Sequence, residues 1–220
     1  MTESPPSSTG FEPDRPAIDV SHLPDHAFDW RAPVWWGNTL LMIIETVTIA
    51  LLVASYFYLR RNFNVFPPPK VDVFPPIYKT QPMLLWGSIN LALIVIGCIP
   101  MYITDMFARR MQRGGVLAGL AFMLLLGIAT CWLRWKEFHG VYFWWNDNAY
   151  GSIVWAILGT HATYLLAASL EFLIMGAWVA THELDPAHAL DVTLAGGYWY
   201  WLAGVFVVVY AVVYWAPRVT

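Results

Sequence analysis

The sequence contains few charged residues. Only 12% of its 220 residues are Asp, Glu, Lys or Arg, whereas 58% are hydrophobic, and a typical soluble domain carries roughly a quarter charged residues. Too few charges remain to cover a soluble surface, so we expect lipid to solvate much of the chain. This excludes an ordinary soluble enzyme and a disordered chain. The net charge of −3 gives no attraction for nucleic acid.

Cysteine is scarce as well, and metal-binding patterns are missing from the sequence. The two cysteines, Cys98 and Cys131, both lie inside apolar stretches, which argues against a disulfide framework. There is no CxxCH motif for haem attachment and no paired cysteines beside a histidine that would form a copper site. We therefore predict no catalytic residue, no metal ligand and no cofactor bound by this chain.

Residues 1–33 are polar, acidic, and rich in Pro and Ser. This composition is opposite to that of an Arg-rich transit peptide, and no apolar core follows Met1 as it would in a signal peptide. We interpret this segment as a polar N-terminal tail that lies outside the bilayer.

Five long apolar runs follow the tail. They span residues 34–59, 82–107, 115–134, 151–180 and 193–216. Each approaches or exceeds the ~20 residues that a helix needs to cross ~30 Å of hydrocarbon. The sequence therefore predicts an all-α integral membrane bundle of five transmembrane helices over residues 34–216. Prolines predict an extended connection at 60–81, and we expect a tight hairpin at 108–114.

Five crossings place the two ends of the bundle on opposite sides of the membrane. Arg109, Arg110 and Arg113 crowd the shortest connection, and positive charge in short loops marks the cytoplasmic face. The opposite side also carries basic residues: Arg60, Arg61, Lys70, Lys79, Arg134 and Lys136. The arginine hairpin nevertheless predicts a cytoplasmic N-terminus and a C-terminus outside.

Glu45 lies near the centre of the first apolar run. An acid at this depth costs about 2.5–3.5 kcal/mol on insertion scales, so it needs a protein neighbour or water. Helical spacing places Asn38, Thr48 and Ser55 on the same stripe, which we expect to face other helices. Two interpretations stay open for Glu45. It is either a protonatable group near a proton-uptake route or partner subunit, or a neutral acid that hydrogen-bonds a neighbouring helix.

The fourth run contains three further polar residues, His161, Tyr164 and Glu171. Tyr164 and Glu171 are seven residues apart and share a helix face. A lone histidine in the membrane needs a second ligand or an open iron position to ligate a metal or haem. We therefore interpret His161 as a hydrogen-bonded packing residue.

A group of charged residues and tryptophans lies where the third run ends: Arg134, Lys136, Glu137 and His139, among Trp132, Trp135, Trp144 and Trp145. Long charged side chains at a helix end extend toward water, and tryptophans favour the membrane interface. The sequence thus predicts an interfacial anchor here.

Small residues predict close contacts between helices. Gly115 and Gly119 form a GxxxG step, and Gly197 and Gly204 recur seven residues apart on the last run, where they predict a smooth packing seam. Pro100 predicts a kink in the second helix.

The last three helices carry a series of motifs in a fixed order. The residues are Glu137, then Tyr150-Gly151-Ser152, then Gly159 and His161, and finally Tyr198-Trp199, Tyr210 and Tyr214-Trp215. In this order and spacing, within a five-helix chain, they resemble subunit III of haem–copper respiratory oxidases, the cytochrome c oxidase subunit III family, in its short bacterial form. Glu45, in a helix that ends in aromatic residues, resembles the buried membrane glutamate of that family.

The chain departs from the family at several of its positions. Tyr164 stands where the family has a second histidine, and Tyr200 and Ala203 stand where it has histidine and aspartate. The second helix ends without the Trp-Ala-His of the family. These departures indicate a divergent member.

The resemblance implies a non-catalytic accessory subunit in a bacterial inner membrane. Such a subunit packs beside catalytic subunit I, together with subunit II, in a proton-pumping oxidase that reduces O2 to water. It binds structural phospholipid and supports proton uptake and enzyme stability, while haem and copper lie in the catalytic partner. The resemblance also allows assembly into a respiratory supercomplex. The electron donor, cytochrome c or quinol, is not readable from this chain.

The sequence leaves three alternatives open. The first is the accessory subunit of a nitric oxide reductase, which shares the fold. The second is a small proton-coupled transporter, in which Glu45, Glu171 and His161 would form a relay and inverted repeats or broken helices would be expected. The third is a structural membrane adaptor whose only task is to retain lipid.

Overall fold

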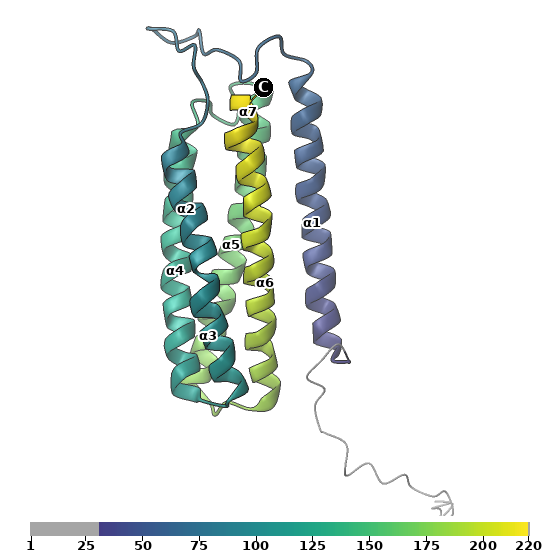
Figure 1. Cartoon of the computed structure of the whole chain (residues 1–220), viewed down its shortest axis with the longest axis vertical. Coiled ribbons are helices and arrows are strands. Elements are labelled where there is room, and N and C mark those ends of the chain that lie inside the picture. Colours follow the sequence, from purple (N-terminus) through teal and green to yellow (C-terminus); the bar gives the residue numbers. More distant parts are fainter. Residues whose placement is uncertain (1–30, 220) are drawn as a thin grey trace, which may run out of the picture.

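The computed structural model describes residues 31–219, which form helices and no named strand (Figure 1). The helices are α1 (Pro33–Arg60), α2 (Leu84–Ile96), α3 (Cys98–Arg109), α4 (Arg113–Gly140), α5 (Ala149–Thr181), α6 (Pro186–Tyr210), the π-helix η1 (Ala211–Trp215) and α7 (Ala216–Val219). Consecutive pieces combine into five segments long and apolar enough to cross a membrane. The predicted all-α bundle of five membrane-crossing helices is confirmed. The predicted N-terminal tail falls almost entirely outside the described residues.

Local signals fix where several helices begin. Pro33 and Pro186 occupy the first turns of α1 and α6, where a missing N–H costs nothing. The side chain of Asn148 accepts a hydrogen bond from the Gly151 N–H at the start of α5, at 2.8 Å. Asp185 does the same for His188 at the start of α6, also at 2.8 Å. Inside the bilayer, helices satisfy their own backbone groups, so the long apolar segments stay helical.

The second membrane segment is interrupted between α2 and α3. Gly97 separates the two helices, and Pro100 has no N–H to donate to the carbonyl four residues earlier, while its ring crowds that carbonyl. The indole N–H of Trp199 on α6 donates to the Ile94 carbonyl just before the break, at 3.2 Å. The kink predicted from Pro100 therefore appears as a break near the middle of the segment.

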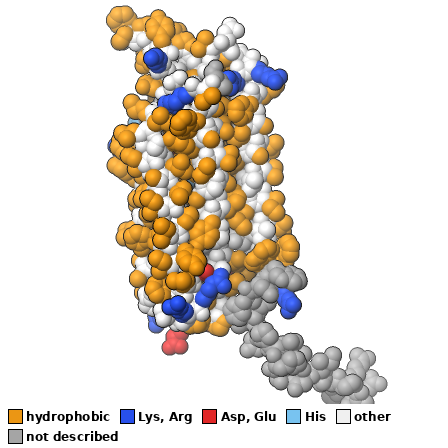
Figure 2. Space-filling view, viewed as in Figure 1, with side chains coloured by type: hydrophobic (Ala, Val, Ile, Leu, Met, Phe, Trp, Pro, Cys, Tyr) orange, Lys and Arg blue, Asp and Glu red, His pale blue; other side chains and the backbone are white. Residues whose placement is uncertain are grey.

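Helices α2 to α6 form a packed bundle, and α1 stands to one side of it (Figure 1). Only Ile49 and Tyr56 of α1 are buried. Its contacts are with α5 and α6, and they include a hydrogen bond from Trp201 Nε1 to Thr46 Oγ1 at 2.8 Å. Hydrophobic side chains cover the flank of the molecule, while Lys and Arg gather toward its two ends (Figure 2). This surface suits a chain solvated by lipid along its length.

The glycines divide into two groups. A Cβ atom at Gly115 would lie 2.5 Å from the Phe107 ring, and one at Gly119 would overlap Thr104, so this pair brings α3 and α4 together as predicted. Nothing lies within 4 Å of a Cβ at Gly197 or Gly204. The predicted packing seam on the last helix is therefore wrong within this chain, because these two positions face open space.

Candidate functional site: a buried polar cluster

Five polar side chains meet in the interior of the bundle. They are Asn90 from α2, Arg134 and Glu137 from α4, His161 from α5 and Tyr214 from η1. Each is at most 2% exposed. Polar groups so deep in a membrane protein require partners, because hydrocarbon offers none. We call these five residues the buried polar cluster.

Glu137 is the acceptor at the centre of the cluster. Its Oε1 accepts from Asn90 Nδ2 at 2.5 Å. Its Oε2 accepts from Arg134 Nη1 at 2.7 Å and from the Tyr214 hydroxyl, also at 2.7 Å. Hydrogen bonds to an ionised carboxylate are roughly twice as strong as neutral ones. The carboxylate thus links α2, α4 and the last membrane segment.

His161 connects the cluster to α5 and α6. Its Nδ1 lies 2.8 Å from Arg134 Nη2, and its Nε2 lies 3.2 Å from the Leu202 carbonyl. A guanidinium only donates and a carbonyl only accepts, so Nδ1 is the acceptor and Nε2 carries the proton. The imidazole is neutral, and both nitrogens are engaged. This confirms His161 as a hydrogen-bonded residue of the interior.

An aromatic ring and a glycine complete the site. Phe206 stacks on His161, with ring centroids 4.7 Å apart, and lies 4.3 Å from Arg134 Cζ, a cation–π geometry. A Cβ at Gly87 would lie 2.6 Å from Tyr214 Cζ. Only glycine at this position leaves room for the Tyr214 ring to reach Glu137.

The interfacial anchor predicted at the end of the third run is wrong for Arg134 and Glu137. Helix α4 continues six residues beyond that run, to Gly140, and turns both side chains inward. Lys136 and His139 behave as predicted, since they pack on exposed Trp132 and Trp135. The missed signal was the Arg134–Glu137 spacing of three residues, which places opposite charges on one helix face.

A second polar region lies between α1 and the bundle. The Glu45 carboxyl group faces the hydroxyl of Tyr198 on α6, close to Tyr164 on α5. Neither Glu45 Oε2 nor Tyr198 Oη has a hydrogen-bond partner among the described residues, although both atoms are buried. Asn38, seven residues before Glu45, donates to the Leu194 carbonyl of α6 at 3.1 Å. This half of the predicted stripe faces other helices.

The other half of the stripe is more exposed. Thr48 and Ser55 are exposed, and each hydroxyl bonds to a carbonyl of its own helix, Ile44 at 3.0 Å and Leu51 at 2.8 Å. Thr48 nevertheless lies within reach of Tyr164 on α5. Among the described residues, no contact with another helix is found for the Ser55 hydroxyl, because a step of three added to steps of seven turns this end of the stripe away from the bundle.

Open space lies beside α1 in three places. A cavity of about 530 Å³ is lined by residues of α1, α3 and α6, including Trp35, Arg109 and Gly197. A second, of about 520 Å³, lies where Glu171 and Asp191 meet α1. A third, of about 350 Å³, has an almost wholly apolar lining from α1 and α6. We call the first and third together the α1–α6 groove.

The remaining motif residues lie apart from the cluster. Tyr150 is fully buried and meets Phe66 edge to face at 4.9 Å, while the Ser152 hydroxyl donates to the Trp145 carbonyl at 2.6 Å. Gly159 has nothing within 4 Å of a Cβ position. His161 bonds to neither Glu45 nor Glu171, so these three residues form no direct hydrogen-bonded relay.

The two tryptophans of the motif series differ in exposure. Trp199 is fully buried, whereas Trp215 is 53% exposed and turned away from the bundle. Among residues 31–219, no three His, Cys, Asp or Glu side chains are grouped so as to hold a metal ion.

Known proteins resemble this chain over most of its length, although no family model matches it. Cytochrome bo(3) ubiquinol oxidase subunit 3 of Pseudomonas aeruginosa is 26% identical over 203 residues, which cover 90% of this chain and 92% of that protein. Cytochrome c oxidase subunit 3 of Equus caballus is 19% identical over 177 residues, covering 79% and 67%. Its counterpart in Rhizopus stolonifer is 28% identical over 105 residues, covering 47% and 37%. Together with the five-helix fold, these relatives support a divergent subunit III of the haem–copper respiratory oxidase type.

Proposed function

We propose that this chain is the non-catalytic accessory subunit III of a proton-pumping haem–copper terminal oxidase in a bacterial inner membrane. It would pack beside catalytic subunit I, with subunit II in the same complex, and those partners would carry the haem and copper. The observation that carries this proposal is the similarity to an oxidase subunit 3 over 90% of the chain. Relatives from both ubiquinol and cytochrome c oxidases leave the electron donor open.

The chemistry of the interior supports an accessory role. In the buried polar cluster, Arg134 and Glu137 neutralise each other, and both nitrogens of His161 are occupied within the chain. These groups therefore hold four membrane segments together. Such a network fixes the relative positions of helices that must present a constant surface to a partner.

The α1–α6 groove supports the binding of structural phospholipid. Its middle is lined by aliphatic residues of α1 and α6, which suits an acyl chain. Its end beside α3 offers the ring of Trp35 and the exposed guanidinium of Arg109, which pairs with Asp105 through Nε at 2.9 Å. The remaining guanidinium donors suit a phosphate headgroup at the interface. Native mass spectrometry of the complex, with Arg109→Gln compared with the parent, tests this assignment. Equal lipid retention by the two would contradict it.

Glu45 is the candidate for a role in proton uptake. Its carboxyl group lies beside the Tyr198 hydroxyl, and its buried Oε2 has no hydrogen-bond partner among the described residues, which leaves room for a role besides packing. Glu45→Gln should leave assembly intact, because the amide has the same size, and should lower the rate of proton uptake at equal haem content. Glu183→Gln in the exposed connection before α6 is the control. Unchanged uptake would assign Glu45 to packing.

Purification of the native complex tests the proposal as a whole. A tagged chain extracted from membranes in mild detergent should carry a haem-containing partner, visible in the optical spectrum and identified by mass spectrometry. Isolation of the chain without any haem protein would overturn the assignment. The basic connection at 108–114 favours a cytoplasmic N-terminus and therefore a C-terminus on the other side of the membrane. A reporter enzyme that works only outside the cell membrane should therefore be active when it is fused to the C-terminus.

A further inference from the structure

The connection between α1 and α2 contains a short hairpin that rises beyond the helix ends, on the side where the chain ends (Figure 1). Lys70 and Ile77 exchange both backbone hydrogen bonds, at 2.8 and 2.9 Å. Such a mutual pair defines an antiparallel turn. The six residues 71–76 form its tip. We call residues 70–77 the hairpin.

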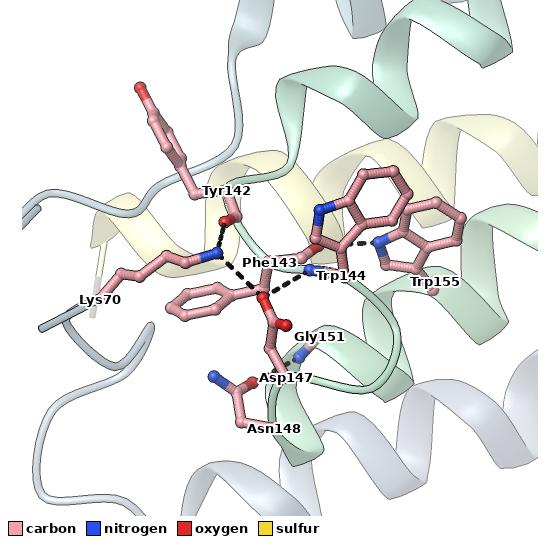
Figure 3. A network of polar contacts seen from close by, with 8 residues as sticks. All are labelled: Lys70, Tyr142, Phe143, Trp144, Asp147, Asn148, Gly151 and Trp155. Atoms are coloured by element: carbon pink, nitrogen blue, oxygen red, sulfur yellow. Dashed lines mark hydrogen bonds and ion pairs between the residues drawn. The ribbon is translucent and has the colours of Figure 1, made fainter. Parts of the chain in front are cut away.

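The base of the hairpin is fixed to the loop between α4 and α5 (Figure 3). Lys70 Nζ donates to the Tyr142 carbonyl at 3.0 Å and pairs with Asp147 Oδ2 at 2.9 Å. The same carboxylate oxygen accepts from the Trp144 N–H at 2.9 Å. Behind the hairpin, the Thr80 hydroxyl donates to the Pro68 carbonyl at 2.8 Å.

The tip of this anchored hairpin is apolar. Phe74 is 98% exposed, Val71 is 60% exposed, and Pro75 and Pro76 are exposed beside them. An aromatic side chain held in water on a fixed support is unfavourable unless it is buried by a partner. The prolines restrict the backbone, so little conformational freedom would be lost when the tip binds.

The connection that carries the hairpin, residues 60–81, is basic. The Lys70–Asp147 pair cancels its own charge, which leaves Arg60, Arg61 and Lys79 against the single acid Asp72. Figure 2 shows Lys and Arg gathered at this end of the molecule. A complementary surface would therefore carry carboxylates around an apolar pocket.

We infer that the hairpin is a docking element for a protein surface outside the bilayer, with an apolar pocket for Phe74 ringed by Asp and Glu. The contact adds a water-exposed interface to the membrane-embedded packing of the proposed function. An exposed Phe on a rigid turn acts as an anchor, and the basic residues orient the acidic partner.

A photoreactive amino acid at position 74 tests the docking directly. p-Benzoylphenylalanine would replace Phe74 in the full chain, expressed in its native membranes and irradiated before purification. We expect a protein adduct that maps to a water-exposed, Asp- and Glu-containing segment of another chain. The same probe at Tyr58, which is 71% exposed within α1, serves as control and should react with lipid or membrane segments.

Charge reversal distinguishes a specific dock from chance proximity. Arg61→Glu with Lys79→Glu should lower the yield of the Phe74 adduct several-fold and leave the Tyr58 adduct unchanged. Phe74→Ser should leave the stability of this chain unchanged but weaken retention of the partner. Adducts with lipid, adducts with a second copy of this chain, or a yield insensitive to charge reversal would overturn the inference.

The outcome also separates this inference from the proposed function. A complex that carries haem but gives no Phe74 adduct would overturn the docking role alone. A Phe74 adduct with an acidic protein segment, in a preparation without haem, would support the docking role and contradict the oxidase assignment.

Discussion

The hydroxyl of Tyr214 donates to Glu137 at 2.7 Å, although 77 residues separate the two in the sequence. Both side chains are at most 2% exposed. A buried hydrogen bond to a charged group contributes about 1.5–3 kcal/mol. Tyr214→Phe should therefore lower the free energy of unfolding, measured by denaturant titration in detergent micelles, by an amount in that range.

Tyr210→Phe is the matched control for that substitution. Tyr210 lies one turn earlier, and its hydroxyl is 2.6 Å from the Ser88 hydroxyl in a partly buried site. A neutral hydrogen bond contributes about 0.5–1.5 kcal/mol. Equal losses for the two variants would show that the charge on Glu137 adds nothing to the bond.

Removal of one partner of the buried Arg134–Glu137 ion pair should lower the free energy of unfolding more than replacement of both partners by neutral side chains. Arg134→Met alone leaves the Glu137 carboxylate without its counter-charge and should destabilise the chain by about 3–5 kcal/mol. Arg134→Met with Glu137→Gln should cost less than the sum of the single changes. The exposed pair Arg109–Asp105, where the arginine is 64% exposed, should lose about 0–1 kcal/mol when Arg109 becomes Met. Strict additivity at Arg134 and Glu137 would contradict the coupling.

Gly87→Ala should loosen the cluster by steric conflict. Its new methyl group would lie 2.6 Å from Tyr214 Cζ, and overpacking of this kind costs about 1–3 kcal/mol. Gly159→Ala, where nothing lies within 4 Å, should be neutral or stabilising by up to about 1 kcal/mol through helix propensity. Thermal unfolding of the two variants in the same detergent checks both expectations. A destabilised Gly159→Ala would contradict the open space at this position.

Gly204→Leu should leave the isolated chain folded. The position is exposed and faces open space, so a larger side chain meets no other helix of this chain. Circular dichroism and unfolding of the purified subunit should match the parent. Reduced retention in the assembled complex, with an unchanged subunit, would locate a partner at this face, whereas an unfolded subunit would contradict the packing of α6.

The contact between the hairpin and the α4–α5 loop should weaken in acid, because it depends on the charge of Asp147. The Trp144 N–H that donates to the Asp147 carboxylate, together with Lys70, holds the pKa of this group below its ordinary value. A lowered pKa means that the contribution to stability is complete above the ordinary aspartate pKa. It is lost as pH falls through the lower folded value, which places the change below about pH 4.

Limited proteolysis of the 60–81 connection as a function of pH measures this response. In the parent, cleavage should rise only at the acid end, when Asp147 takes up a proton and releases Lys70. Asp147→Asn should be cleaved equally at every pH, at the rate that the parent reaches in acid. A pH-dependent response in the Asn variant would assign the effect to another group.

The five membrane segments follow from hydropathy because each is a local property of about twenty consecutive residues. The buried polar cluster does not follow from hydropathy, because the hydrogen-bond partners of Glu137 lie 47 and 77 residues away in the sequence, at Asn90 and Tyr214. Hydropathy also ended the third run at Arg134, because an averaged scale treats a paired charge like an unpaired one. A paired charge can be told from an unpaired one only in the packed bundle.

The spacing of small residues also predicts helix packing only in part. The GxxxG step at Gly115 and the seven-residue step at Gly204 carry the same sequence signal, yet one packs on Phe107 and the other faces open space. A glycine permits close approach without specifying which neighbour approaches. The direction of each face depends on the helix around it, which a single-helix pattern leaves undetermined.

The position of Tyr214 in the buried polar cluster depends on the number of residues in the π-helical segment η1. Its wide turn buries Val212, Val213 and Tyr214 in succession, and a regular helix advances about 100° per residue. Deletion of one residue here would restore a regular helix and change the direction of the Tyr214 side chain relative to Glu137. A substitution that keeps the count would not do so. Spacing in this stretch is therefore constrained more tightly than residue identity.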